Sequence, residues 1–416
     1  MSRVVVIGAG LAGLVAGIRL AREGAHVTVV AKGAGSLPLS PGTIDVLGYA
    51  PGRVTSPREE MAGFTEANPG HPYAHLAPAL DEALEWFRGL VPELDYVGGT
   101  AGNMLLPTAV GVPRPTALAP AAMAAGDLRS GGRLVAVGLT ALKDFFPSLL
   151  ADNLRRADLP GGPVEVRHAE VDASPRPGRA DVAAQVFARA LDDAPFRAVL
   201  GDALRGVARD GETILMPAVL GMARPAEALA EVTRRAGAPV AEVPTVPPSV
   251  PGLRLNAALT AALRAAGGRL VLGPSAVGSA GDGGRLTGVR VQEAARTRTL
   301  AADAVVLATG GFSAGGIELD SHGALHEVVL GLPVTGPAEG DRGLSSRHLD
   351  HQPLMAAGVA VDAGGRPVGP GGEPVWENLW AAGSIVAGAL PWREKSGEGI
   401  AIAGGYRAAS AIQEGT

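Results

Sequence analysis

The chain has 416 residues, of which 47% are hydrophobic and 19% are charged, so it can form more than one hydrophobic core and is too apolar to be disordered as a whole. It contains no cysteine, which excludes disulfides and any metal or iron–sulfur centre held by its own thiolates, and we predict no metal site. The formal net charge of −5 and the aromatic content of 4% argue against nucleic-acid binding.

The amino-terminal segment predicts a nucleotide-binding βαβ unit. A β-branched apolar run over residues 3–7 leads into the turn Gly8, Gly10 and Gly13, and apolar residues at helical spacing follow. In such a turn Gly8 allows the tight bend, Gly10 lets backbone approach a pyrophosphate, and Gly13 lets the helix pack closely on the strand. A second buried strand over 26–30 completes the unit. We therefore predict a nucleotide cofactor at the amino terminus of the first helix.

The second strand lacks the acidic residue that usually follows it in dinucleotide folds. That Asp or Glu accepts hydrogen bonds from the adenosine ribose, whereas here the strand is followed by Ala31, Lys32 and Gly33. Lysine only donates, so Lys32 either contacts a 2′-phosphate or is a solvated residue at a strand end. The adenosine half of a dinucleotide is therefore less well specified than its pyrophosphate.

Later segments indicate that the cofactor domain is discontinuous. A helix over 256–266, a strand over 269–272 and a hairpin turning at 282–284 precede an apolar strand that ends at Thr309 and Gly310. A second such strand ends at Gly383 and Ser384, and a helix over 398–413 closes the chain. This order resembles the two-dinucleotide-binding-fold flavoproteins of the fumarate reductase and succinate dehydrogenase group.

That resemblance implies a flavin site built from both halves of the chain. The late strand and turn would lie beside the ribityl chain, where Ser384 replaces the usual Asp, and the last helix would point its amino terminus at the flavin. Residues 40–43 would face the flavin ring, and because they contain no histidine, covalent attachment is not expected. The candidate cofactor-binding residues are Gly8, Gly10, Gly13, Lys32, Ser40, Gly42, Thr43, Thr309, Gly310, Gly383, Ser384 and Gly399.

The predicted fold class is α/β, a Rossmann-like two-dinucleotide-binding-fold flavoprotein with an inserted α/β lobe. We expect the discontinuous flavin-binding domain to comprise residues 1–50, 250–311 and 375–416, and the substrate or partner lobe to comprise 51–249 and 312–374. The first insertion is expected to be irregular through Pro72 and to continue with a helix over 80–90. Strands over 133–137, 164–168 and 212–216 then alternate with helices over 142–157, 181–191 and 226–236.

Turn-dense uncharged blocks in this lobe carry a closer resemblance. Residues 103–108, 114–116, 214–218 and 244–254, together with motifs along the whole chain, are similar to the B subunits of the anaerobic glycerol-3-phosphate dehydrogenase family. The resemblance implies that the complex oxidises sn-glycerol 3-phosphate to dihydroxyacetone phosphate and passes electrons to menaquinone. It also implies an FAD-dependent A subunit and an iron–sulfur C subunit that anchors the complex, which would place this chain in the cytoplasm at the inner face of the cell membrane.

The cofactor itself has two candidates. The family resemblance implies FMN, which agrees with the missing carboxylate after the second strand. The intact glycine turn suits the pyrophosphate of FAD, which is the alternative.

Oxidation of a secondary alcohol needs a base near the hydroxyl and cations for the phosphate. The candidates are Arg114, Arg254 and Arg342 for the phosphate, and His71, His326 and His348 for the base. Each of these arginines is more often a structural or solvated residue, because arginine is the default cation of this composition. A histidine such as His71, before Pro72, is likewise more often a hydrogen-bonded loop residue than a catalyst. The catalytic residues therefore stay open at this point.

Three functions remain. The chain is an oxidoreductase subunit that handles electrons, or an accessory subunit that keeps the flavoprotein fold for assembly, or a separate FAD-dependent reductase of the fumarate reductase type. The last rests on fold resemblance alone.

Overall fold

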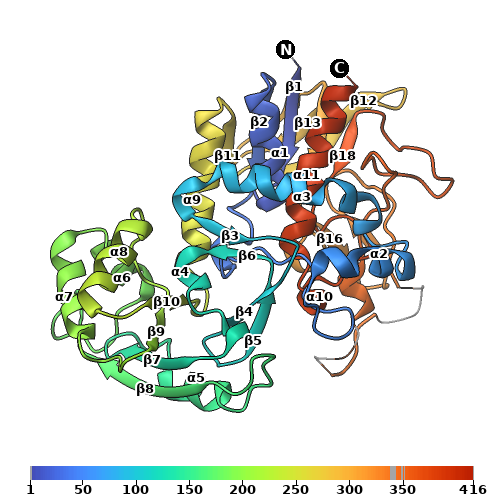
Figure 1. Cartoon of the computed structure of the whole chain (residues 1–416). Helices are drawn as coiled ribbons and strands as arrows, with labels where there is room; N and C mark the ends of the chain where they lie inside the picture. The colour runs from blue at the N-terminus through green and yellow to red at the C-terminus, as the bar shows by residue number, and fades with distance from the viewer. Residues whose placement is uncertain (1, 338–342, 348–349, 351, 416) are drawn as a thin grey trace.

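A five-stranded parallel sheet forms the centre of the computed structural model, which describes residues 2–337, 343–347, 350 and 352–415. The strand order is β11-β2-β1-β15-β18. The strands are β1 (Arg3–Ile7), β2 (His26–Ala31), β11 (Arg269–Leu272), β15 (Ala304–Leu307) and β18 (Leu379–Ala381). Both ends of the chain lie beside this sheet (Figure 1). Segments from the start, middle and end of the sequence therefore share one sheet.

Alternation along β1 directs side chains into two different cores. Val4 and Val6 join the core on the helical face, formed with α1 (Leu11–Arg22), α3 (Tyr73–Leu90), α9 (Val250–Ala265) and α11 (Gly397–Glu414). Val5 and Ile7 join the core on the opposite face. There an antiparallel sheet covers them, in the order β12 (Ser275–Asp282), β13 (Arg285–Gln292) and β14 (Thr297–Ala301). The result is a layered α/β fold, and the predicted fold class is confirmed.

The segment that follows the first 50 residues is more regular than expected. Helix α2 (Pro57–Ala67) occupies sequence predicted to be irregular, because Pro57 is compatible with a first helical position and the Ser56 hydroxyl accepts from the Glu59 N–H at 3.3 Å. Helix α3 begins at Tyr73, earlier than predicted, and contains Pro78. Four short strands follow, β3 (Tyr96–Gly98), β4 (Met104–Pro107), β5 (Pro113–Thr116) and β6 (Leu118–Pro120).

A second parallel sheet forms a lobe with its own core, the green region of Figure 1. Its order is β10-β9-β7-β8, from β7 (Arg133–Leu139), β8 (Glu165–Val171), β9 (Glu212–Pro217) and β10 (Val240–Val243). The helices around it are α5 (Pro147–Leu154), α6 (Ala184–Ala190), α7 (Ala194–Leu204) and α8 (Pro225–Ala236). The predicted strand and helix alternation is therefore present, with α7 in addition.

The packing shows where the other inserted segments belong. Leu84 and Phe87 of α3 share the helical-face core with α1. Ile317, Val329 and Val359 share the opposite core with β1. The domain bounds themselves stay a prediction, but these parts of 51–249 and 312–374 pack on the central sheet, whereas the core of the second lobe draws on residues between 105 and 250.

The remaining short elements are α4 (Ala121–Ala124), α10 (Pro391–Glu394), β16 (Ile317–Leu319) and β17 (Leu325–Glu327). None of the helices in the described part of the chain has the length and apolar character needed to cross a membrane.

A buried ion pair joins the second lobe to the central fold. Arg254 on α9 donates to both carboxylate oxygens of Glu242 on β10, at 2.7 and 3.0 Å, and to the carbonyl of Gly221 at 2.7 Å. The Glu242 carboxylate also accepts from the Leu220 N–H at 2.6 Å. The two side chains are only 4% and 0% exposed. Losing the guanidinium would therefore leave a carboxylate buried without its cation.

We predict that Arg254→Met lowers the free energy of unfolding by about 3–5 kcal/mol, the usual cost of breaking a buried pair. Urea denaturation measures this change. The matched control is Arg285→Met, because Arg285 pairs with Glu377 at 3.9 Å with both side chains more than half exposed. The control should cost no more than about 1 kcal/mol. Equal effects of the two substitutions would contradict a stabilising role for the buried pair.

Candidate functional site

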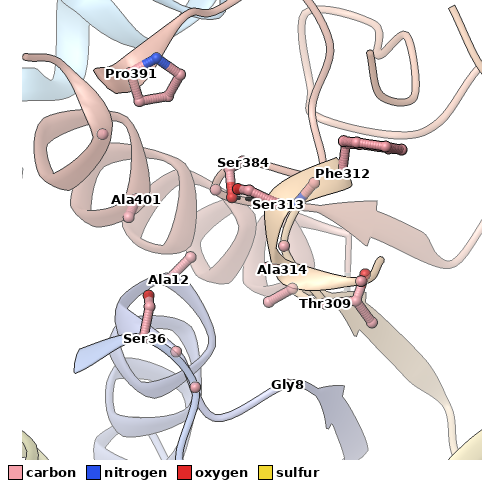
Figure 2. A pocket seen from close by; sticks show the side chains of 18 of the residues that line it. Gly8, Ala12, Ser36, Thr309, Phe312, Ser313, Ala314, Ser384, Pro391 and Ala401 are labelled. Carbon is pink, nitrogen blue, oxygen red and sulfur yellow. Dashed lines mark hydrogen bonds between the residues drawn. The ribbon is translucent and has the colours of Figure 1, made fainter. Parts of the chain in front are cut away.

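One cavity of about 1230 Å³ lies at the carboxyl ends of the central strands. The turn after β1 contributes Gly8 and Gly10, the segment after β15 contributes Thr309 and Gly310, and the segment after β18 contributes Ser384. Figure 2 shows Ala12 of α1, Ala401 of α11 and the loop carrying Thr309 around this space. Ligands of open parallel sheets bind at this edge, because the strand order brings the following loops together here.

The three glycines of the first turn have different physical tasks. Gly8 has φ +116°, donates its N–H to Val30 O at 2.9 Å, and lies so close to Ala308 O that a Cβ would collide with it. A Cβ on Gly13 would collide with Gly8 O. A Cβ on Gly10, by contrast, would meet no heavy atom of the described residues within 4 Å. Gly8 and Gly13 are therefore needed for backbone packing, and Gly10 keeps the cavity open in front of α1.

The residues around this opening fit a nucleotide diphosphate. Gly10 is the N-cap residue of α1 and has no side chain to cap the first N–H groups of the helix, so these can bind an anion. The buried Thr309 hydroxyl oxygen has no hydrogen-bond partner among the described residues and lines the cavity. Ser384 accepts from the Gly311 N–H at 3.3 Å, with its hydroxyl at the cavity wall. Gly10, the first N–H groups of α1, Thr309 and Ser384, which we call the cradle, thus offer donors and an unpartnered polar atom where a cofactor would lie.

The cavity also extends beyond the glycine turn. Lys32 at the end of β2 and Ser275 and Ala276 of β12 line it. In this fold the end of the second strand borders the adenosine ribose, whereas a mononucleotide phosphate would end at the turn. The extent of the cavity therefore fits FAD better than FMN.

The lining of the cavity also includes four charged residues that interact with one another. They are Asp45, Arg114 of β5, Lys395, which follows α10, and Glu398 of α11. We call these four residues the charged cluster. Arg114 makes a close ion pair with the buried carboxylate of Asp45, with Nε at 3.1 Å. Asp45 also accepts from the Thr116 hydroxyl at 2.6 Å. Two cations and two carboxylates thus meet at the wall of a cofactor-sized space.

Burial and neighbouring charge shift the protonation equilibria of this cluster. Burial, and after it the negative charge of Asp45, raises the pKa of Glu398 to about 7, against a smaller opposing effect of Arg114. Burial and the positive charge of Arg114 lower the pKa of Lys395. A carboxyl group that changes protonation near neutral pH therefore lies at the wall of the cavity.

Eight of the predicted cofactor residues line this cavity, namely Gly8, Gly10, Lys32, Ser40, Thr309, Gly310, Gly383 and Ser384. Gly13, Gly42, Thr43 and Gly399 lie outside its lining. A Cβ on Gly42 would press on Pro251, and one on Gly399 would collide with the hydroxyl of Tyr73. The buried Thr43 hydroxyl lies 3.4 Å from Asp45. The structure therefore explains Gly13, Gly42 and Gly399 by close packing and places Thr43 behind the charged cluster.

The predicted catalytic candidates are dispersed. Arg114 lines the cavity, but Arg254 lies outside its lining, and its buried guanidinium is committed to Glu242 and to the Gly221 carbonyl. His326 is exposed and lies 3.0 Å from Asp320. Arg342 and His348 lie outside the described residues.

His71 is buried outside the cavity lining, so it is not placed as a base for a ligand there. Its Nδ1 accepts from the Tyr73 N–H at 3.1 Å, so the neutral ring carries its proton on Nε2, 3.1 Å from Glu394. Glu394 also accepts from the Ser396 hydroxyl at 2.8 Å and from the Leu390 N–H at 3.0 Å. His71 therefore holds the loop that precedes α11.

Sequence reasoning missed Asp45 and Lys395, and used Glu398 only to mark the start of a helix. One signal was available, since the chain has only three lysines among 36 basic residues and two of them, Lys32 and Lys395, line this cavity. No comparable signal marks Asp45, because its partners are distant in the sequence.

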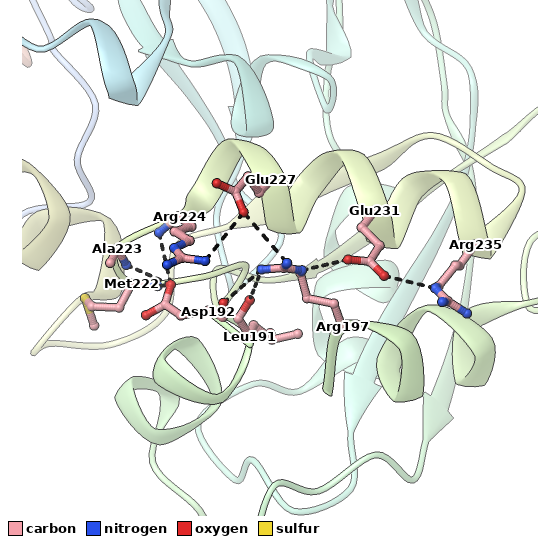
Figure 3. A network of polar contacts seen from close by, with 9 residues as sticks. All are labelled: Leu191, Asp192, Arg197, Met222, Ala223, Arg224, Glu227, Glu231 and Arg235. Carbon is pink, nitrogen blue, oxygen red and sulfur yellow. Dashed lines mark hydrogen bonds and ion pairs between the residues drawn. The ribbon is translucent and has the colours of Figure 1, made fainter. Parts of the chain in front are cut away.

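A second set of charged residues, shown in Figure 3, is internally paired. Arg197 of α7 donates to Glu231 of α8 at 2.7 Å and to Asp192 O at 2.9 Å. The Asp192 carboxylate accepts from three consecutive N–H groups, those of Met222, Ala223 and Arg224. These bonds fasten α8 to α7, so we assign this network to the stability of the second lobe.

Comparison with known proteins agrees with the geometry of the cavity. The model of a family described as "FAD binding domain" matches residues 3–400. This match supports FAD, the alternative at the sequence level, and does not support FMN.

Relatives match over almost their whole length. A protein of Halobacterium salinarum, named as the probable B subunit of an anaerobic glycerol-3-phosphate dehydrogenase, is 33% identical, covering 99% of this chain and 98% of that protein. The B subunit of the Yersinia pestis anaerobic glycerol-3-phosphate dehydrogenase is 30% identical, covering 96% and 95%. Among solved structures, 3-ketosteroid delta1-dehydrogenase from Sterolibacterium denitrificans has 12% identity and a TM-score of 0.48, with 100% of both chains covered. A flavocytochrome c3 fumarate reductase has 11% identity and a TM-score of 0.44, covering 99% of this chain and 78% of that chain.

We predict that Gly10→Asp leaves the fold intact, because the added Cβ has room, and removes the cofactor. A carboxylate about 4 Å from a phosphate repels it by about 4 kcal/mol at an effective dielectric constant of 20. FAD affinity should therefore fall by about a hundredfold or more. The measurement is the flavin bound per chain after purification.

Gly52→Asp is the matched control, because a Cβ on this exposed glycine would also meet no described heavy atom within 4 Å. It should keep its flavin. A Gly10→Asp variant with a full complement of flavin would show that the pyrophosphate does not approach this turn.

Proposed function

Because the chain belongs to the FAD-binding family of anaerobic glycerol-3-phosphate dehydrogenase B subunits, we propose that it is an electron-handling subunit of such a complex. The complex would oxidise sn-glycerol 3-phosphate to dihydroxyacetone phosphate and pass the electrons to a quinone. The observation that carries this proposal is the continuous cavity, whose lining combines a nucleotide cradle with the charged cluster.

The cradle residues would hold FAD in a defined position. Gly10 and the first N–H groups of α1 would receive the pyrophosphate, and the unpartnered Thr309 hydroxyl would donate to the bound cofactor. Ser384 would orient the neighbouring part of the cofactor through its hydroxyl. When bound, FAD supplies a two-electron acceptor for a hydride from the substrate carbon.

The charged cluster offers what a phosphorylated alcohol requires. Arg114 and Lys395 present guanidinium and ammonium donors at the cavity, and both groups bind phosphate oxygens readily. Asp45 holds Arg114 in place by a close ion pair in which the Asp45 side chain is 1% exposed. A phosphate bound here would place the rest of a three-carbon substrate in the same cavity as the cofactor.

Electrons would leave this chain through partner subunits. The sequence has no cysteine, so an iron–sulfur cluster that receives them would be held by another chain. We propose the FAD-dependent A subunit and the iron–sulfur C subunit of the complex as these partners. In this arrangement the chain would be peripheral to the inner face of the cell membrane, attached through the C subunit.

The test uses the complex purified with its partner subunits, carrying either the natural chain or Gly10→Asp. We expect the natural complex to oxidise sn-glycerol 3-phosphate with a quinone analogue as acceptor, and the variant complex to assemble normally with turnover reduced at least tenfold. Released flavin, identified by chromatography, should include FAD from this chain. Unchanged turnover in an assembled complex that lacks this flavin would favour the accessory role, in which the fold serves assembly alone.

A further inference from the structure

Glu398 lies where the last helix meets the cofactor cavity. It is in the first turn of α11, and it lines the cavity together with Asp45, Arg114 and Lys395. The N–H of the next residue, Gly399, donates to Asp45 O at 2.9 Å, so the helix start and the Asp45 segment are joined by backbone. The two carboxyl groups are therefore held together at one wall of the cavity.

The two carboxyl groups have different surroundings. Asp45 is 1% exposed, is paired with Arg114 and accepts from the Thr116 hydroxyl, so its oxygens are committed to these donors. The Glu398 carboxyl interacts instead with the backbone N–H groups of Asp45 and of Glu398 itself. Of the two, Glu398 is the one free to exchange a proton with a ligand.

We propose that Glu398 is the proton acceptor for the substrate hydroxyl, and that Asp45 is a positioning residue that holds Arg114 for the substrate phosphate. This inference rests on the proposed function, because it takes a phosphorylated secondary alcohol as the ligand. It adds to that function the residue that removes the proton.

Atoms and electrons balance in this step. The hydroxyl proton passes to the Glu398 carboxylate, while the oxygen forms a double bond to its carbon. The hydrogen on that carbon would leave with its electron pair, for which bound FAD would supply the acceptor, so the alcohol would be oxidised by two electrons to a ketone. The protonated Glu398 then releases its proton to solvent before the next turnover.

The charges that face Glu398 suit this role near neutral pH. Burial and the negative charge of Asp45 favour its protonated form, Arg114 favours the carboxylate, and the pKa is raised to about 7. Tyr73 and Tyr96, also packed nearby, are buried and have raised pKa values, so they stay neutral. Lys395 is the remaining charge at the cluster. A base with a pKa near the working pH is deprotonated in a large fraction of the molecules and is still basic enough to accept the hydroxyl proton.

Backbone and side-chain contacts fix the position of the loop before α11, which carries Lys395 and leads into Glu398. Lys395 has φ +54°, in the left-handed region that favours glycine. The Gly48 and Tyr49 N–H groups donate to Glu394 O at 2.7 and 3.0 Å, and His71 holds the Glu394 side chain. These contacts stabilise the unusual backbone, so the Lys395 and Glu398 side chains start from defined positions.

The experiment measures kcat/KM for sn-glycerol 3-phosphate against pH in the intact complex. In the natural complex kcat/KM should rise with pH through about 7, because the base form of a group with a raised pKa is populated only above it. Glu398→Gln should lower kcat/KM by about 10²- to 10⁴-fold and remove the rise. Glu398→Asp, which keeps a carboxyl group, should retain a pH-dependent rise at a reduced rate.

Glu414→Gln is the matched control, because Glu414 is exposed at the other end of the same helix. It should keep the natural rate and profile. An independent readout is the infrared C=O band of a protonated carboxyl in the purified complex. This band should disappear between pH 6 and 8 in the natural protein, as expected for a pKa of about 7, and should be missing at both pH values in Glu398→Gln.

The outcomes separate this inference from the proposed function. An active complex whose Glu398→Gln variant keeps its rate and pH profile overturns the inference alone. So does a natural protein without the titrating infrared band, even if Glu398→Gln fails to fold. A natural complex that does not oxidise glycerol 3-phosphate overturns the proposed function and, with it, the inference.

Discussion

The whole site depends on the close approach of backbone at three places around the first turn. Gly8 lies against Ala308 O, Gly13 lies against Gly8 O, and Gly405 of α11 lies against Ala12 O, and in each case a Cβ would collide. These contacts bring β1, α1, β15 and α11 within reach of one another. Because side chains are missing where the elements meet, the loops that follow the strands can surround one continuous cavity. The close backbone contacts at Gly8, Gly13 and Gly405 thus leave room for the cavity at the carboxyl ends of the strands.

Local patterns predicted the central fold and the cradle, since their physical causes are local. A continuous β-branched apolar run identifies β1, which is buried from Val4 to Ile7, and the spacing of Gly8, Gly10 and Gly13 identifies the turn. The strand that ends at Gly383 and Ser384 was also predicted from its apolar run, whereas the place of Ser384 beside the cofactor came from the resemblance to flavoproteins. Helix α2 was missed because prolines around it suggested irregular backbone, although Pro57 occupies a first helical position, where its missing N–H costs nothing.

The polar end of the cavity could not be predicted in this way. Asp45 and Arg114 are 69 residues apart in sequence, and their pairing depends on how β5 lies against the first segment. Composition made the arginines uninformative, since almost every cation of the chain is an arginine. Arg114 and Arg254 look alike in the sequence, yet one lines the cofactor cavity and the other fastens the second lobe through Glu242. Only the tertiary structure shows which carboxylate each one meets.

The charge balance of the cluster limits how a substrate can lie in the cavity. With Asp45 and Glu398 ionised, two carboxylates offset Arg114 and Lys395, and an added phosphate makes the region net negative. A phosphate close to Glu398 would favour its protonated form and so remove the base that the reaction requires. Under the proposed function, the phosphate would therefore lie on the side of Arg114 and Lys395 that is remote from Glu398, with the hydroxyl directed toward Glu398. Asp45 contributes to this order, because its negative charge holds the guanidinium in place at the cavity wall. Under the proposed function, the same four side chains would select both the phosphate and the orientation of the carbon to be oxidised.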